Sequence, residues 1–167
     1  MSLSVPFLTT LVKPWCAGKD LASLLLDERK LSSDRVKFYM SQLVLALETL
    51  HDLNIVHRDV KTANIFLTGD GNLILGDFGL AKQFCTNLTC TTNERCGIPS
   101  WMSPAQIAGS AYSFDTDMWG LGMVMFRMLT GRLPSDDSGV AEADVTFRAG
   151  DCVDSIAQDL HPYFRDV

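Results

Sequence analysis

Residues 57–82 read HRDVKTANIFLTGDGNLILGDFGLAK, and this stretch decides how the rest of the chain is interpreted. Two short apolar runs, 65–68 and 73–76, flank a turn rich in Gly and Asn, which predicts a β-hairpin. Because a hairpin brings its two ends together, the polar side chains just outside its strands should converge on one small volume. These side chains are Asp59, Lys61, Asn64 and Asp77. Two carboxylates, a carboxamide and an ammonium could together hold Mg²⁺ and phosphate oxygens and accept a hydroxyl proton.

The composition indicates one folded domain with an acidic balance. The 167 residues are 47% hydrophobic and 20% charged, which is typical of a globular domain. A net charge of −6 disfavours a nucleic-acid partner. The longest apolar run, 118–129, is broken by Arg127 and is too short to span a bilayer, so no membrane partner is expected. Five cysteines without a Cys-x-x-Cys pair favour reduced thiols and a cytoplasmic or nuclear location.

Three stretches around the hairpin predict helices. Asp20 precedes the apolar residues 21–26 and can cap a short helix there. Residues 33–52 repeat apolar side chains at helical spacing, which indicates an amphipathic helix with one buried stripe. The stripe consists of Val36, Met40, Leu43, Leu47 and Leu50. Asp117 opens a strongly apolar stretch that ends at Gly131, and a helix that is apolar on nearly all faces is a buried one.

The motif His-Arg-Asp-x-Lys-x-x-Asn at 57–64, followed by Asp-Phe-Gly at 77–79, resembles the catalytic loop and metal-binding motif of eukaryotic protein kinases. The resemblance implies a fold that is mainly α with a small β-hairpin, like the carboxy-terminal lobe of a kinase. It presents residues 1–167 as a partial kinase domain with recognisable parts. These are a hinge at about 13–19, the catalytic loop 57–64, an activation segment 77–105 and a central helix 117–130.

The same resemblance implies an ATP-dependent protein serine/threonine kinase that transfers a phosphoryl group from Mg-ATP to a protein hydroxyl. Asp59 would orient and deprotonate that hydroxyl, and Lys61 would stabilise the transferring group. Asn64 and Asp77 would hold Mg²⁺. The residues expected around ATP are Cys16 of the hinge at the adenine, Asp20 at the ribose, Phe66 as the floor of the adenine, and Lys61, Asn64 and Asp77 at the phosphates and metal.

Other residues are expected to have structural or regulatory roles. They are His57, Arg58, Phe78, Glu94 and Asp117. By resemblance, Asp117 holds the backbone of the catalytic loop. Glu94 stands where NIMA-related kinases carry a phosphorylatable threonine, so we expect its fixed negative charge to pair with Arg58 and order the loop in part. An alternative interpretation is that Glu94 is solvated and that Thr91 or Thr92 is the phosphorylation site.

The sequence also departs from the kinase pattern. Lys13 replaces an apolar residue at the back of the nucleotide pocket, Ile98 replaces a threonine, and Ala105 replaces a glutamate. No Gly-x-Gly-x-x-Gly occurs in the 167 residues, so we expect that the amino-terminal lobe is missing and that the chain is inactive alone. The segments 16–24, 41–47, 63–67 and 102–106 look most like NIMA-related serine/threonine kinases. The alternative function is a pseudokinase or truncated paralogue that binds proteins and transfers nothing.

Overall fold

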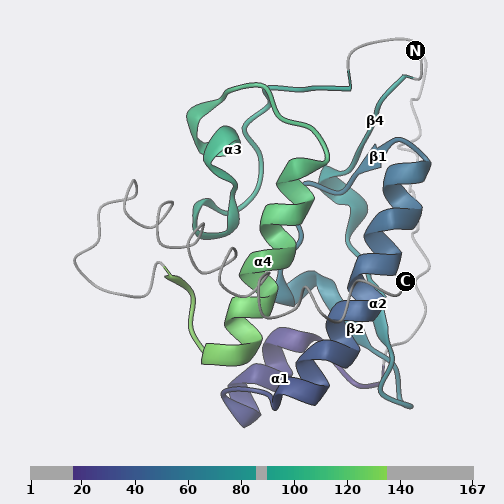
Figure 1. Ribbon diagram of the computed structural model, residues 1–167, viewed down its shortest axis with the longest axis vertical. Coiled ribbons are helices and arrows are strands. Elements are labelled where there is room, and N and C mark those ends of the chain that lie inside the picture. The colour runs from purple at the N-terminus through teal and green to yellow at the C-terminus, as the bar shows by residue number, and fades with distance from the viewer. Residues whose placement is uncertain (1–16, 86–89, 135–167) are drawn as a thin grey trace, which may run out of the picture.

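The computed structural model describes residues 17–85 and 90–134 of the chain. Helices dominate this part, and the strands are short (Figure 1). The helices are α1 (Leu21–Glu28), α2 (Ser33–Asp52), α3 (Pro104–Ala108) and α4 (Asp115–Thr130), and the strands are β1 (Ile55–Val56), β2 (Ile65–Leu67), β3 (Leu73–Leu75) and β4 (Lys82–Gln83). The prediction of a mainly α fold with a small β-hairpin is confirmed.

Parts of the predicted hinge and carboxy-terminal region lie outside the described residues. Lys13 and Cys16 of the hinge are among them. So are residues 1–12, whose apolar side chains predict a strand, and residues 141–149, whose sequence predicts a short helix. The described end of the hinge pairs with the hairpin, because the Gly18 amide donates to the Leu67 carbonyl at 3.0 Å and the Leu67 amide donates to the Lys19 carbonyl at 2.8 Å. The chain therefore enters α1 alongside β2.

Local sequence explains how α1 begins. Asp20 is its N-cap, and its Oδ1 accepts a hydrogen bond from the Ser23 amide at 2.7 Å, as the sequence predicts. The helix buries Leu21 and Leu25 in the core. The Leu31 amide donates to the Met128 carbonyl at 2.8 Å, so the turn after α1 is held against the end of α4.

The core lies between α2 and α4, which run side by side in Figure 1. The predicted stripe of α2 is buried at four of its five positions, and the last, Leu50, is partly buried against the same core. Residues of α4 such as Val124 and Met128 are completely buried against it. Packing of these two apolar faces provides the rigid base on which the hairpin and its loops are placed.

The expectation that α4 is buried on nearly all faces is wrong at its amino-terminal end. The helix starts at Asp115, two residues before the predicted start, and Met118 leaves 51% of its surface exposed. Met118 lines a groove between α2 and α4 together with Leu45 and Leu121. Met118 and Leu121 of this part of α4 therefore face the groove.

Two antiparallel strand pairs build the rest of the described fold. In the predicted hairpin, Ile65 pairs with Leu75 and Leu67 pairs with Leu73. The second pair was not predicted: β1 pairs with β4, with Val56 opposite Lys82. This pairing brings the chain that follows Asp-Phe-Gly back beside the start of the catalytic loop.

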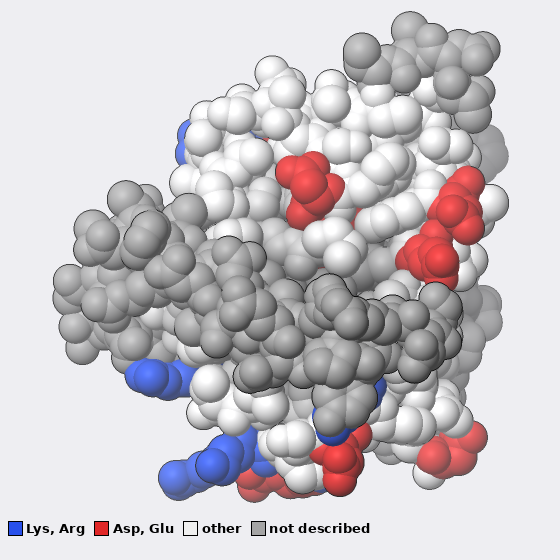
Figure 2. Space-filling model, in the orientation of Figure 1, with Lys and Arg blue, Asp and Glu red and all other residues white. Residues whose placement is uncertain are grey.

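The described surface carries both signs of charge. On the face in Figure 2, Lys and Arg side chains occur mainly near the end of the molecule that contains α1, while Asp and Glu side chains occur in several separate places. Within residues 17–85 and 90–134, no helix has the combined length and apolar character that crossing a bilayer requires.

Candidate active site

Asp59 lies at the centre of a hydrogen-bonded cluster in the catalytic loop. Its Oδ2 accepts from the Lys61 ammonium at 2.6 Å and from the Asn64 carboxamide at 2.8 Å. The same Asn64 nitrogen donates to the Asp59 carbonyl at 2.9 Å, which closes the loop on itself. Asp59 is only 8% exposed, so the three polar groups interact in a partly desolvated environment. The Oδ1 atom of Asp59 takes no part in these bonds.

The hairpin places Asp77 beside this cluster without bonding it to the cluster. The Gly76 amide donates to the Asn64 carbonyl at 2.9 Å, so the residue that precedes Asp77 is tied to the residue that ends the loop. Asp77 is exposed and has a left-handed backbone, with φ of 61°. Its Oδ1 accepts only a long bond from the Gly79 amide at 3.4 Å. Three of the four predicted residues are thus in direct contact, and the fourth is their close neighbour.

The residues expected near a nucleoside lie on the adjoining side of the hairpin. Asp20 and Phe66 form an antiparallel bridge between the segment that enters α1 and β2. The Phe66 ring covers Gly76, since a Cβ atom added to that glycine would lie 2.9 Å from the ring. Asp20 and Asp77 are therefore both next to residues that contact Phe66 or its strand, and Cys16 lies outside the described residues.

Asp117 of α4 anchors the catalytic loop. The carboxylate is completely buried and accepts from the backbone amides of His57 and Arg58, both at 2.8 Å. His51 of α2 lies 2.9 Å from the same carboxylate through its Nε2 atom. The His57 ring lies 3.0 Å from the Gly76 carbonyl through Nε2 and packs on Phe78 with ring centroids 5.0 Å apart. The loop is consequently fixed both to the central helix and to the Asp-Phe-Gly segment.

Glu94 lies between two cations. Its carboxylate accepts from Arg58 at 2.6 Å and from Lys82 at 2.6 Å. These two hydrogen bonds lower the pKa of Glu94 to about 2, and the bond from Arg58 makes the larger contribution to this shift. Burial of Arg58 by itself lowers its pKa, but the bonds to Glu94 and Tyr112 outweigh burial and raise it. The predicted pair of Arg58 with Glu94 is present in the structure, and its regulatory role stays a prediction.

Thr92 is poorly placed for modification, while Thr91 is open to solvent. Thr92 is 8% exposed, and its amide and carbonyl both bond to the backbone of Tyr112. Its hydroxyl accepts from the Lys82 ammonium at 3.0 Å. Thr91 is exposed, so the alternative interpretation of the phosphorylation site rests on that residue.

Three residues near the site have no signal in the sequence pattern. Lys82 reaches Glu94 through the β1–β4 pairing, and the Tyr112 hydroxyl donates to the Glu94 carbonyl at 2.5 Å. Gln106, at the start of α3, donates to the Arg58 carbonyl at 3.2 Å. Each contact joins segments that are distant in sequence, so no local spacing could have identified these residues.

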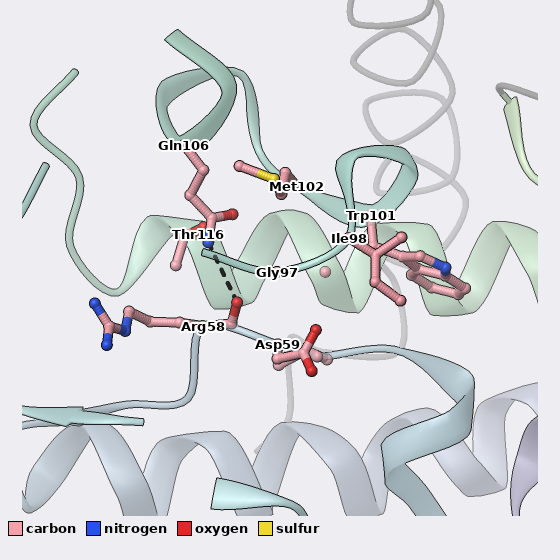
Figure 3. Close-up of a pocket in the computed structure, with 10 residues that line it drawn as sticks. Arg58, Asp59, Gly97, Ile98, Trp101, Met102, Gln106 and Thr116 are labelled. Carbon is pink, nitrogen blue, oxygen red and sulfur yellow. Dashed lines mark hydrogen bonds between the residues drawn. The ribbon is translucent and has the colours of Figure 1, made fainter. Parts of the chain in front are cut away.

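The departures at Ile98 and Ala105 change what the activation segment can contact. Ile98 lines a small pocket of about 10 Å³ beside Asp59, and its hydrocarbon side chain offers no hydrogen bond there (Figure 3). Ala105 lies in α3 and contributes only its carbonyl, which accepts from the Ser110 amide at 3.0 Å. Neither residue can replace the polar side chain that the kinase pattern has at its position.

The donor set suits a cation that is bound jointly with phosphates. In the described part of the chain, no group of three or more His, Cys, Asp or Glu side chains is placed to hold a metal ion. Magnesium in proteins is commonly held by one or two carboxylates together with substrate phosphates and water. The carboxylate of Asp77 and the carboxamide oxygen of Asn64 fit that requirement, because the bonds of Asn64 to Asp59 use only its nitrogen.

A helical lobe with an acid, an ammonium and a carboxamide gathered at one end of a hairpin has the arrangement of groups that is typical of the protein kinase class. The protein kinase domain family matches residues 7–159, and the chain belongs to that family.

Three similar proteins show how this chain relates to kinases. A Caenorhabditis elegans protein whose name identifies it as ribosomal protein S6 kinase alpha-1 is 43% identical over 124 residues. This match covers 74% of this chain and 16% of that protein. RAC-beta serine/threonine-protein kinase A of Xenopus laevis is 38% identical over 141 residues, 77% of this chain and 29% of the relative. Protein kinase C zeta type of Oryctolagus cuniculus is 36% identical over 126 residues, 75% of this chain and 21% of the relative. The chain thus spans under a third of their lengths, and none of the three supports the NIMA-related assignment.

Proposed function

We propose that these residues form the catalytic half of an ATP-dependent protein serine/threonine kinase. The observation that carries the proposal is the cluster of Lys61 and Asn64 on one oxygen of Asp59. The arrangement leaves the other carboxylate oxygen of Asp59 to accept a proton from a substrate hydroxyl. Serine/threonine specificity is supported by Lys61 in the loop and by the printed name of the RAC-beta relative.

Each side chain has a separate task in this proposal. Asp59 orients the hydroxyl and takes its proton as the bond from that oxygen to the γ-phosphorus of ATP forms and the bond from that phosphorus to the bridging oxygen breaks, so that ADP leaves. The Lys61 ammonium stabilises negative charge on the transferring phosphoryl group, and its bond to Asp59 keeps the carboxylate in place. Asn64 and Asp77 would hold Mg²⁺, which when bound neutralises charge on the phosphate oxygens. Asp20 and Phe66 would contact the ribose and the adenine, with Cys16 of the hinge at the adenine edge.

Glu94 would supply a permanent charge in place of a phosphate. It bridges Arg58 of the catalytic loop and Lys82 of β4, so it ties the activation segment to the loop without modification. A carboxylate carries one charge and two oxygens, against about −1.5 to −2 and three oxygens for a phosphate. The segment is therefore ordered less strongly than a phosphorylated one would be.

Two narrower expectations remain predictions. The resemblance of the segments 16–24 and 102–106 to NIMA-related kinases favours that subfamily, but the relatives described above do not support it. The cysteine usage favours a cytoplasmic or nuclear location, and Cys85 and Cys96 carry free thiols.

Phosphoryl transfer tests the proposal directly. Protein in which an amino-terminal kinase lobe precedes these residues is incubated with Mg²⁺, ATP labelled at the γ-phosphate and a mixture of protein substrates, and labelled amino acids are identified after hydrolysis. We expect label on serine and threonine, and we expect Asp59→Asn to lower kcat by about 10²–10⁴. Asp70→Asn, which removes an exposed carboxylate from the hairpin turn, should leave kcat unchanged.

Two results would contradict the proposal. The first is transfer that Asp59→Asn does not change. The second is a folded protein that transfers no label, which would favour the alternative of a pseudokinase that acts as a protein-binding module.

A further inference from the structure

The backbone of Arg58 is held on both sides of its Cα, at the amide and at the carbonyl. Arg58 has φ of 68°, in the left-handed region that a long side chain seldom adopts. Its amide donates to Asp117 of α4 at 2.8 Å, and its carbonyl accepts from the Gln106 carboxamide at 3.2 Å (Figure 3). A strained backbone of this kind persists only where its surroundings determine it. The carbonyl contact is the less obvious restraint, because Gln106 lies 48 residues away in the sequence.

Burial and local hydrogen bonds hold the Gln106 side chain in one position. It is 2% exposed, and it is the third residue of a capping box at the start of α3. Its Oε1 accepts from the Ser103 amide at 2.9 Å, while the Ser103 hydroxyl accepts from the Gln106 amide at 3.3 Å. The Thr116 hydroxyl of α4 donates to the Ser103 hydroxyl at 3.0 Å, so the capping box is itself fixed to the central helix.

The oxygen and the nitrogen of the Gln106 carboxamide therefore have different roles. The oxygen completes the cap of α3, and the nitrogen points at two carbonyls, those of Arg58 at 3.2 Å and Cys96 at 3.4 Å. A cap alone requires only the oxygen. The nitrogen joins the catalytic loop to the segment just before Gly97. A Cβ atom added to Gly97 would lie 3.8 Å from Asp59 Oδ1, so this segment passes close to the Asp59 carboxylate.

We propose that Gln106 is a positioning residue for Asp59: its carboxamide nitrogen fixes the Arg58 carbonyl, and so sets the direction in which the Asp59 carboxylate points. The proposal rests on the function assigned to Asp59 above. Ile98 borders the same pocket and has no polar group, so it cannot supply this restraint. Displacement of a catalytic group by about 1 Å can lower a rate by about a hundredfold, so a single bond to the neighbouring peptide is sufficient to matter.

The central comparison is between Gln106→Met and Ser103→Ala. The methionine has a similar length and removes the donor, whereas the alanine disrupts the same capping box and leaves the Gln106 nitrogen on Arg58. We expect Gln106→Met to lower kcat by about tenfold to a hundredfold and to change the KM for ATP by less than about twofold. Ser103→Ala should retain kcat within about threefold, even if its melting temperature falls as much as that of Gln106→Met.

A second measurement does not depend on activity. Hydrogen exchange of the backbone amides at 57–60 should become about twofold to tenfold faster in Gln106→Met than in Ser103→Ala, which is the effect of losing one net hydrogen bond. If the protein transfers no phosphate, the proposed function fails while this exchange measurement still decides the role of Gln106.

Gln106→Glu provides an independent variant. It keeps an oxygen for the α3 cap and, when ionised, has no donor for the Arg58 carbonyl, so its exchange and kcat should follow Gln106→Met. Equal exchange and equal kcat in Gln106→Met and Ser103→Ala would overturn the proposal, because the role of Gln106 would then be confined to the cap.

Discussion

Glu94 illustrates how one exposed side chain can join two parts of the site. Its side chain is 55% exposed, whereas its partner Arg58 is 9% exposed, so the pair lies at the edge of the buried loop. Salt and solvent weaken such a pair, but the second cation, Lys82, makes it a small network. We therefore expect any ordering effect of this network on the activation segment to depend on pH.

The direction of that dependence follows from the pKa of Glu94, which is about 2 in the folded protein against an ordinary value of 4.5. A depressed pKa contributes stability that is fully present above 4.5 and is lost as the pH falls through about 2. We expect hydrogen exchange in residues 92–97 to accelerate across this window in the parent relative to Glu94→Gln, with α2 as the internal reference. Raising the salt concentration should reduce the difference.

The pairing itself is tested by a double-mutant cycle on Arg58→Met and Glu94→Gln. We expect a favourable coupling at low salt that weakens as salt is added, measured from local exchange. Zero coupling, or the same pH response in parent and Glu94→Gln, would contradict the assignment of Glu94 as the charge that orders the segment.

At the scale of elements, α4 is the part on which the catalytic loop is built. Asp117 bonds the loop backbone from one turn of the helix, and Gly120 contacts Val60 from the next. A loop without regular hydrogen bonds of its own gains a single conformation from such a partner.

Asp117→Ala should loosen this loop. The substitution leaves two buried backbone amides without an acceptor, which we expect to cost about 3 kcal/mol in the free energy of unfolding. Asp115→Ala is the matched control, because that carboxylate is exposed on the same first turn and accepts only from the Ser113 amide, so its loss should cost under about 1 kcal/mol. Urea denaturation that gives equal losses for both variants would show that the anchor is not Asp117.

Gly120→Ala tests the close contact of α4 with the loop. An added Cβ atom would lie 2.7 Å from the Val60 Cβ and 2.8 Å from the Val60 carbonyl oxygen. A helix normally gains about 1 kcal/mol from this substitution, but the crowding should reverse the sign and destabilise by about 1–3 kcal/mol. Thermal denaturation measures this change in stability. Gly69→Ala is the control, because the atom nearest to an added Cβ there is 3.7 Å away, and its stability should be close to that of the parent. A stabilised Gly120→Ala variant would contradict the contact.

At the scale of the whole molecule, the residues proposed to contact nucleotide lie on and around β2. Asp20 is bridged to Phe66, the Phe66 ring covers Gly76 next to Asp77, and the 167 residues contain no glycine-rich loop to cover phosphates. A site that buries most of its ligand binds far more tightly than an open face. The affinity of this chain for nucleotide should therefore be low.

We expect ATP with Mg²⁺ to bind the 167-residue chain with a Kd weaker than about 10 µM, which corresponds to roughly −7 kcal/mol. Titration calorimetry measures this directly, and Asp77→Ala should weaken any binding further while Asp70→Asn should not. A Kd of 10 µM or tighter by the same scale would mean that the chain closes the pocket by itself.

The fold and half of the candidate site could be predicted because their signals are local. The two apolar runs around a Gly and Asn turn specify the hairpin, and the spacing of Val36, Met40, Leu43 and Leu47 specifies the buried face of α2. The loop of Asp59, Lys61 and Asn64 lies within a few residues of chain, so a short motif is sufficient to bring these groups together. In each case the interacting groups are neighbours in sequence, and backbone geometry alone determines which of them meet.

The tertiary structure decided the contacts that hold this loop in place. Lys82 reaches Glu94 only because β4 pairs with β1, and Tyr112 reaches it only because its backbone bridges Thr92. Gln106 meets the Arg58 carbonyl only because α3 is capped and fixed to α4. These partners are separated by long loops, and their meeting depends on which segments pack together when apolar surface is buried, a collective result that no single spacing in the sequence encodes.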